Sequence, residues 1–178
     1  MTIDDIREIA KIALENGIAV ASHDDDTYEK LELVKSLGTT LSEFPITIDI
    51  AKRAREMGLY TIGGAPNILL GGSHSGNLSA AESILNEATD ILCSDYYPPA
   101  MLHAVFAMHK KYELGLCQMF KLVTINPAKA VNMGHEIGSI KEGKKADVMI
   151  IEIIENDFPV ITTVFVDGRL NLKTNYNV

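Results

Sequence analysis

The sequence has few cysteines, no surplus of basic residues and no long apolar run. Cys93 and Cys117 are the only cysteines and form no Cys-x-x-Cys pair, so nothing indicates a disulfide framework or a thiolate zinc site. The 16 Lys and Arg against 24 Asp and Glu give a formal net charge of −8. This balance argues against non-specific binding to nucleic acid or to anionic membranes. Because the start of the chain lacks signal-peptide features and no segment approaches about 18 consecutive apolar residues, we expect a cytoplasmic protein, neither secreted nor membrane-spanning.

What is present is the composition of an ordinary globular protein, with 178 residues of which 47% are apolar and 22% charged. Helical patterns alternate with short apolar runs through the first half of the chain. The predicted helices cover about residues 2–15, 26–37, 47–57 and 79–88, and the predicted strands cover residues 18–22, 39–44, 59–63 and 91–94. Apolar runs without alternation are typical of strands buried on both faces, so the pattern predicts an α/β fold with a parallel sheet and crossover helices.

The second half of the chain has a different pattern. Helices are predicted over residues 100–111 and 116–123, and a short one opens at Pro127. Strand-like runs follow at residues 146–154 and 160–166, with a turn at Asp167 and Gly168. We therefore expect two parts, an α/β body over residues 1–136 and a small β unit over residues 137–178.

Polar side chains that directly follow the predicted strands are the candidates for chemistry, because reactive groups of parallel α/β folds lie at the carboxyl edge of the sheet. His23, Glu43, Asn67 and Asp95 occupy such positions. Imidazole and carboxylate groups on one edge suit a divalent metal such as zinc, which lowers the pKa of a bound water to about 7. The pattern favours metal-assisted hydrolysis, with His23 as a ligand and Asp95 as a ligand or proton acceptor.

Each candidate also has a purely structural explanation. His23 could cap a helix, and Asp24, Asp25 and Asp26 are divided between helix capping and solvent, with Asp24 also open to a role in the site. Glu43 is either a site carboxylate or an ordinary strand exit, and Asp95 could form an Asx turn. Residues 71–77 (GGSHSGN) offer amide, hydroxyl and imidazole groups that could cradle phosphate oxygens, or they form a plain flexible loop.

Several motifs in order resemble one family. Residues 21–27 (ASHDDDT), 42–45 (SEFP), 64–67 (GAPN), 71–77 (GGSHSGN) and 94–96 (SDY), followed by 126–128 (NPA), 138–143, 146–147 and 166–169 (VDGR), resemble the phosphonate-metabolism hydrolases of the amidohydrolase superfamily. The resemblance implies a (β/α)8 TIM-like barrel with a metal centre at the carboxyl ends of its strands, together with a β-rich domain built from both chain ends.

The resemblance also implies roles for individual residues. His23 would be a metal ligand from a middle strand, and Asp95 would both bind metal and accept the proton of the attacking water. The residues placed beside the substrate would be Asn67, Ser73, His74, Ser75 and Asn77. The implied reaction is metal-dependent cleavage of a ribose 1-phosphonate 5-triphosphate to the 5-phosphate and pyrophosphate. The alternatives are another amidohydrolase acting on cyclic amides or N-acyl substrates, and a non-catalytic α/β module that binds an anion.

The chain departs from the family pattern because it contains no His-x-His pair and only four predicted βα units. It resembles the C-terminal half of the enzyme, which makes a partial barrel. Four strands cannot close a barrel, and exposed edge strands invite pairing. We therefore expect a homo-oligomer or pairing with the missing N-terminal half, a phosphorylated small-molecule substrate, and no nucleic-acid or membrane partner.

Overall fold

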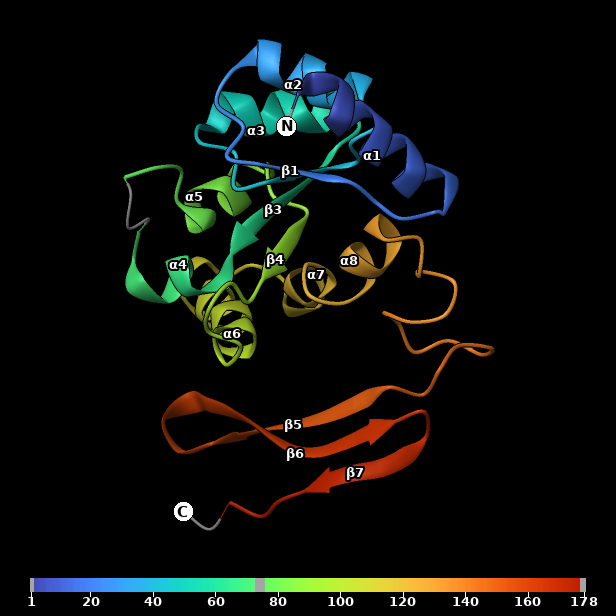
Figure 1. Cartoon of the computed structure of the whole chain (residues 1–178). Coiled ribbons are helices and arrows are strands. Elements are labelled where there is room, and N and C mark those ends of the chain that lie inside the picture. Colours follow the sequence, from blue (N-terminus) through green and yellow to red (C-terminus); the bar gives the residue numbers. More distant parts are fainter. Residues whose placement is uncertain (1, 73–75, 177–178) are drawn as a thin grey trace.

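The computed structural model describes residues 2–72 and 76–176. It consists of a parallel sheet surrounded by helices and, beyond the helices, a separate antiparallel sheet (Figure 1). The elements of the first part are α1 (Ile3–Glu15), β1 (Ala21–His23), α2 (Tyr28–Ser36), β2 (Leu41–Glu43), α3 (Ile48–Glu56), β3 (Tyr60–Gly64), α4 (Ala65–Leu70), α5 (Ala80–Leu85) and β4 (Ile91–Cys93). The later elements are α6 (Ala100–Tyr112), α7 (Leu116–Lys121), α8 (Ile125–Ala130), β5 (Val148–Ile154), a 3₁₀ turn (Glu155–Asp157), β6 (Phe158–Val166) and β7 (Arg169–Lys173).

The larger sheet is parallel and has the order β1-β2-β3-β4. His23 at the end of β1 is the register partner of Glu43 at the end of β2, and Gly64 at the end of β3 is that of Cys93 at the end of β4. The strand exits therefore meet along one edge. The predicted α/β fold with a parallel sheet is confirmed, although the predicted strand at residues 18–22 is wrong in place and in burial. The observed strand is Ala21–His23, of which only the central residue is buried.

Hydroxyl side chains fix the starts of several helices. Thr2 and Asp5 form the predicted capping box of α1, and Thr27 and Thr47 each accept a backbone N–H in the first turn of α2 and α3. The prediction that Asp26 opens α2 is wrong by one residue, because the capping hydroxyl belongs to Thr27. Caps of this kind satisfy an amide that the helix itself leaves unpaired.

Helices α2 and α3 lie beside each other (Figure 1), and α3 packs against β3. A cluster of buried side chains from α2, α3 and the start of β3 fills this contact and includes Leu31, Ile50 and Leu59. A larger cluster joins α5, α6, α7 and β4 around Leu92 and Met108. These two clusters fix the helices against the sheet because close-packed cores resist displacement.

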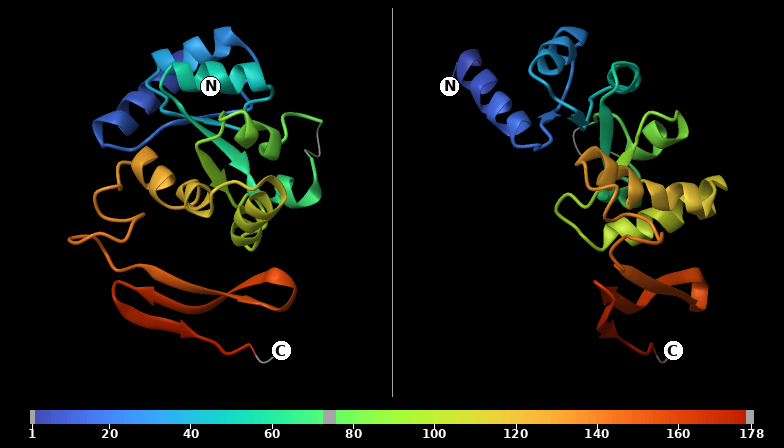
Figure 2. Two further views of the ribbon diagram at one scale, coloured as in Figure 1. Left: turned by 180° about the vertical axis from the view of Figure 1, so that it is seen from behind. Right: turned by 90° about the vertical axis from the view of Figure 1, so that its right-hand side faces the viewer.

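Helix α1 is packed much less closely than the others. Only Ala10 of this helix is buried, whereas Ile6, Ile9 and Ile12 are exposed in the described structure. Helix α1 stands to one side of the body in the second view of Figure 2. Strand β1 beside it pairs only with β2 among the described strands. This end of the sheet therefore presents an open edge and an unburied apolar helix face.

Strands β5, β6 and β7 form an antiparallel sheet in that order. Asp167 and Gly168 adopt positive φ angles between β6 and β7 and make the predicted turn. The sheet contacts the body through α6, where His103 packs against Phe158 with 4.7 Å between ring centroids. Within residues 2–72 and 76–176, no helix has the length and apolar character needed to span a membrane.

Candidate functional site

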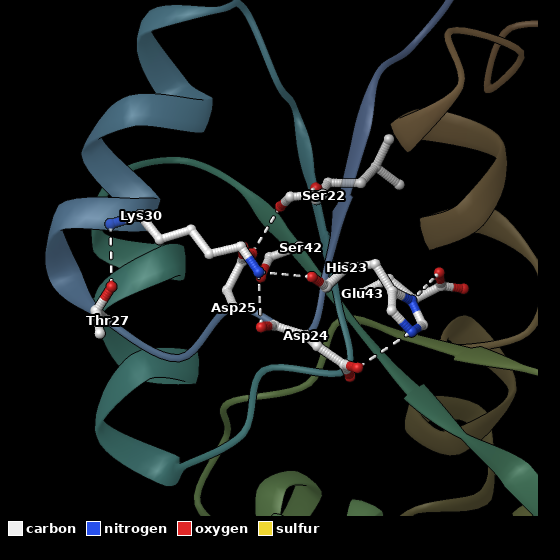
Figure 3. A network of polar contacts seen from close by, with 9 residues as sticks. Ser22, His23, Asp24, Asp25, Thr27, Lys30, Ser42 and Glu43 are labelled. Carbon is white, nitrogen blue, oxygen red and sulfur yellow. Dashed lines mark hydrogen bonds and ion pairs between the residues drawn. The ribbon is translucent and has the colours of Figure 1, made fainter. Parts of the chain in front are cut away.

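The exits of β1 and β2 place an imidazole and a carboxylate side by side. The Nδ1 atom of His23 lies 2.8 Å from Oε2 of Glu43, and its Nε2 atom lies 3.5 Å from Oδ2 of Asp24 (Figure 3). Because a carboxylate only accepts, the 2.8 Å contact places a proton on Nδ1. In the neutral Nδ1–H tautomer the lone pair is on Nε2, whose 3.5 Å separation from Asp24 is too long for a strong hydrogen bond. The side chain of His23 is 57% exposed, so this nitrogen is accessible to a ligand.

Left-handed backbone follows three of the four strands. Asp24, Phe44 and Asp95 have φ angles of 52°, 55° and 49°. Such angles are uncommon outside glycine and are strained for a bulky residue such as Phe44. The ring of Phe44 stands edge-on to the His23 imidazole, with 5.4 Å between centroids. The chain thus turns sharply at the edge of the sheet and directs these side chains toward the site.

A small pocket of about 190 Å³ lies at the same edge, between the exits of β2, β3 and β4. Its polar lining includes Asp24, Asn67, Asn77 and Asp95, and Tyr96 forms part of the wall. No Lys or Arg is among its described lining residues. His23 lies beside the pocket, against Phe44, and is not part of its lining. An acidic pocket of this kind suits a cation, or an anionic ligand whose charge a cation offsets.

Asp95 faces the end of β3. A Cβ atom placed on Gly64 would lie 3.9 Å from Oδ2 of Asp95 and 3.4 Å from the Phe44 ring, so the absence of a side chain at Gly64 keeps this part of the pocket open. Burial raises the pKa of the nearby Cys93 thiol, and the negative charges of Glu43 and Asp95 raise it further. Cys93 is therefore held as a neutral thiol, a poor nucleophile and a poor metal ligand at neutral pH.

The structure brings together most of the residues predicted from sequence. His23 and Glu43 are in contact, and Asp95, Asn67 and Asn77 share the pocket. Oδ1 of Asn67 also accepts the N–H of Ala80, which ties α4 to the start of α5. The predicted substrate residues Ser73, His74 and Ser75 lie outside the described part of the chain. Within the described part, no group of three His, Cys, Asp or Glu residues is arranged to hold a metal ion.

Sequence reasoning missed the role of Asp25. It assigned this residue to capping or solvent, yet the side chain is completely buried. Its Oδ2 atom accepts hydrogen bonds from Ser22 and Ser42, and Lys30 lies 3.6 Å from Oδ1. One signal in the sequence could have indicated this ion pair. Lys30 follows the three consecutive aspartates by about one helical turn, a spacing at which opposite charges can meet.

Comparisons with known proteins show the family of the chain. A sequence profile described as "Amidohydrolase family" matches residues 2–170. The chain is 43% identical over 150 residues to the α-D-ribose 1-methylphosphonate 5-triphosphate diphosphatase of Escherichia coli, a match that covers 83% of this chain and 39% of that protein.

Solved structures show the same arrangement of elements. An amidohydrolase from Thermotoga maritima superposes with a TM-score of 0.71 at 21% identity, over 94% of this chain and 46% of the other. An adenosine deaminase from Xanthomonas campestris with bound zinc superposes with a TM-score of 0.69 at 14% identity, over 97% of this chain and 49% of the other. The described sheet and helices therefore correspond to a partial barrel, and the chain spans about half the length of these structures.

Proposed function

The chain belongs to the amidohydrolase family, and from this premise we propose that it supplies one half of a hydrolase acting in phosphonate catabolism. The proposed enzyme adds water across a phosphoanhydride bond of a ribose 1-phosphonate 5-triphosphate and releases the 5-phosphate and pyrophosphate. The convergence of His23, Glu43 and Asp95 on one edge of the parallel sheet supports this proposal. The 43% identity to the E. coli diphosphatase supports the choice of substrate.

The donor set fits a divalent metal in part. The free Nε2 atom of His23 and the carboxylate of Asp95 are donors that zinc accepts, and amidohydrolases are generally metal-dependent. Because the described residues form no group of three such donors, we propose that the remaining ligands come from the other half of the barrel. When bound, a zinc ion would supply Lewis acidity and an activated water.

The residues of this chain would then act on the proton and on the substrate. Asp95, exposed at the pocket, would accept the proton of the attacking water at a carboxylate oxygen. Asn77 and the amide nitrogen of Asn67 would donate to phosphate oxygens, and we propose the same task for Ser73, His74 and Ser75 of the preceding loop. Since the described lining residues include no Lys or Arg, we propose that the charge of a triphosphate is offset from outside this described lining.

We propose a complementary half-barrel as the partner of this chain. Strand β1 is an open edge among the described strands, and the side chains of Ile6, Ile9 and Ile12 in α1 are exposed. The chain covers 39% of its E. coli relative and 46% to 49% of the two solved structures described above. We propose that an N-terminal half-barrel pairs with β1 and buries α1, and that residues 137–178 form the β unit beside residues 1–136. A dimer of this chain would be the alternative outcome of a native-mass measurement.

A chimera tests the proposed reaction. The matching C-terminal part of the E. coli diphosphatase would be replaced by this chain, and pyrophosphate release from the ribose triphosphate substrate would be measured. We expect turnover that Asp95→Asn reduces at least about 100-fold, since general-base catalysis contributes about 10²–10⁴-fold. Asp26→Asn, an exposed neighbour of the site, is the matched control and should leave turnover unchanged.

Two results would contradict the proposal. If the folded chimera hydrolyses cyclic amides or N-acyl compounds but releases no pyrophosphate, the chain belongs to another amidohydrolase activity and the proposed diphosphatase reaction is wrong. Equal turnover in the Asp95→Asn chimera and the unsubstituted chimera would remove Asp95 from the proton step.

A further inference from the structure

A fully buried carboxylate lies directly behind the site and takes no part in the chemistry proposed above. Oδ2 of Asp25 accepts hydrogen bonds from the hydroxyls of Ser22 at 2.6 Å and Ser42 at 2.5 Å. Its Oδ1 atom has no hydrogen-bond partner among the described residues and lies 3.6 Å from Nζ of Lys30. Burying an anion costs free energy unless it is paired, and the nearby ammonium group of Lys30 lowers this cost for Asp25.

The ammonium group of Lys30 also binds the backbone at the end of β1. It donates to the carbonyl oxygen of His23 at 2.8 Å and to that of Asp24 at 2.7 Å (Figure 3). These two hydrogen bonds use two of the three donors of the ammonium group, and its positive charge lies 3.6 Å from Oδ1 of Asp25. The carbonyls belong to the last residue of the strand and to the left-handed residue after it. Lys30 therefore fixes the turn at which the chain leaves the sheet.

The same turn is attached to the exit of β2. The N–H of Asp24 donates to the carbonyl of Glu43, and the N–H of Ile46 donates to the carbonyl of Asp25, at 2.9 Å and 3.0 Å. His23 and Glu43, which make the 2.8 Å side-chain contact, are thus carried by two exits that are bonded to each other. A change in the β1 exit would move the imidazole relative to the Glu43 carboxylate.

We propose that Lys30, anchored by buried Asp25, is a positioning residue that holds the His23 imidazole against Glu43, so that Nδ1 carries the proton and Nε2 presents its lone pair. Lys30 acts through the backbone of His23 and Asp24 and does not touch the substrate pocket. The value of this orientation for a metal ion rests on the proposed function, whereas the orientation itself is a property of this chain. The two can therefore fail separately.

The test determines which ring nitrogen of His23 carries the proton, in the 178-residue chain without added metal. Long-range ¹H–¹⁵N NMR of the ¹⁵N-histidine-labelled protein, recorded in alkaline buffer, distinguishes the two neutral tautomers by which ring nitrogen carries the proton. His23→Gln assigns the signal. In the unsubstituted chain we expect the Nδ1–H form, and in Lys30→Met a shift to the Nε2–H form with the other histidine signals unchanged. Lys30→Arg keeps a cation with several N–H donors and should restore the Nδ1–H form.

Two control variants separate positioning from stability. Lys35→Met makes the same substitution at an exposed position of the same helix and should leave the His23 tautomer unchanged. Ser42→Ala removes one hydrogen bond from Asp25 but leaves both Lys30–carbonyl bonds, so it should lower the urea midpoint of unfolding without changing the tautomer.

The proposal is overturned if Lys30→Met keeps the Nδ1–H form. It is also overturned if Ser42→Ala, which keeps the Lys30–carbonyl bonds, shifts His23 to the Nε2–H form as it loses stability. Should Lys30→Met not fold, Lys30→Gln decides in its place. Its neutral amide can bind only part of the carbonyl pair and should give a mixture of tautomers, and a pure Nδ1–H signal would again overturn the proposal.

Discussion

Replacing Asp25 with alanine should destabilise the protein far more than replacing its neighbour Asp26. The substitution leaves the hydroxyls of Ser22 and Ser42 without their acceptor and Lys30 without its buried counter-ion. Hydrogen bonds to a charged group are worth about 1.5–3 kcal/mol each, and removal of the buried carboxylate recovers part of its desolvation cost. Because the side chain of Lys30 is 35% exposed and stays partly hydrated, the two lost hydrogen bonds dominate, and the net loss should be about 3 kcal/mol.

Urea unfolding followed by far-ultraviolet circular dichroism measures this loss. A domain of ordinary stability has about 5–15 kcal/mol in total, so a loss of this size moves the midpoint far down the urea scale. Asp26 is exposed and makes no side-chain hydrogen bond or ion pair within the described structure, so Asp26→Ala should change stability by no more than about 0.5 kcal/mol. A loss below about 1 kcal/mol for Asp25→Ala would show that the buried cluster does not hold the strand exits together.

Two further predictions concern the core and the thiol beside the pocket. Leu31 is completely buried, so Leu31→Ala should cost about 2–5 kcal/mol in urea unfolding, whereas Leu33→Ala on the exposed side of the same helix should cost no more than about 0.5 kcal/mol. Because burial, and to a smaller extent the charges of Glu43 and Asp95, raise the pKa of the Cys93 thiol, alkylation of Cys93 should require a higher pH than is usual for cysteine. Asp95→Asn removes a negative charge and lowers that pKa, so it should accelerate alkylation of Cys93 by iodoacetamide at fixed pH. The measurement uses a Cys117→Ser background, so that Cys93 is the only thiol. An unchanged alkylation rate would place Asp95 away from the thiol.

Much of the first sheet could be predicted because its signals are local. The hydroxyl at Thr47 and the glycine at position 58 mark the two ends of α3 within a single stretch of chain. Helix α4 was missed because residues 63–76 look like a glycine-rich loop. In the structure the chain turns directly from β3 into a six-residue helix with Pro66 in its first turn, where proline favours helix initiation.

Parts of the site could not be predicted because they depend on residues distant in the sequence. Nothing local distinguishes Asp25 from Asp24 and Asp26, since its burial depends on the hydroxyl of Ser42, 17 residues away. The contact between His23 and Glu43 likewise depends on the register of β1 and β2. Alternation and capping patterns describe one element at a time, whereas these contacts are set by pairing between elements.

Metal content of the reconstituted barrel is the most direct test of the central claim, that the carboxyl edge of β1–β4 carries one half of a metal centre. The chimera with the N-terminal part of the E. coli diphosphatase would be purified, dialysed and analysed for zinc, manganese and iron. We expect near-stoichiometric metal, and its loss when His23 and Asp95 are both replaced by alanine in a chimera that still folds. Equal metal content in the folded double variant would contradict the assignment of the site to this edge.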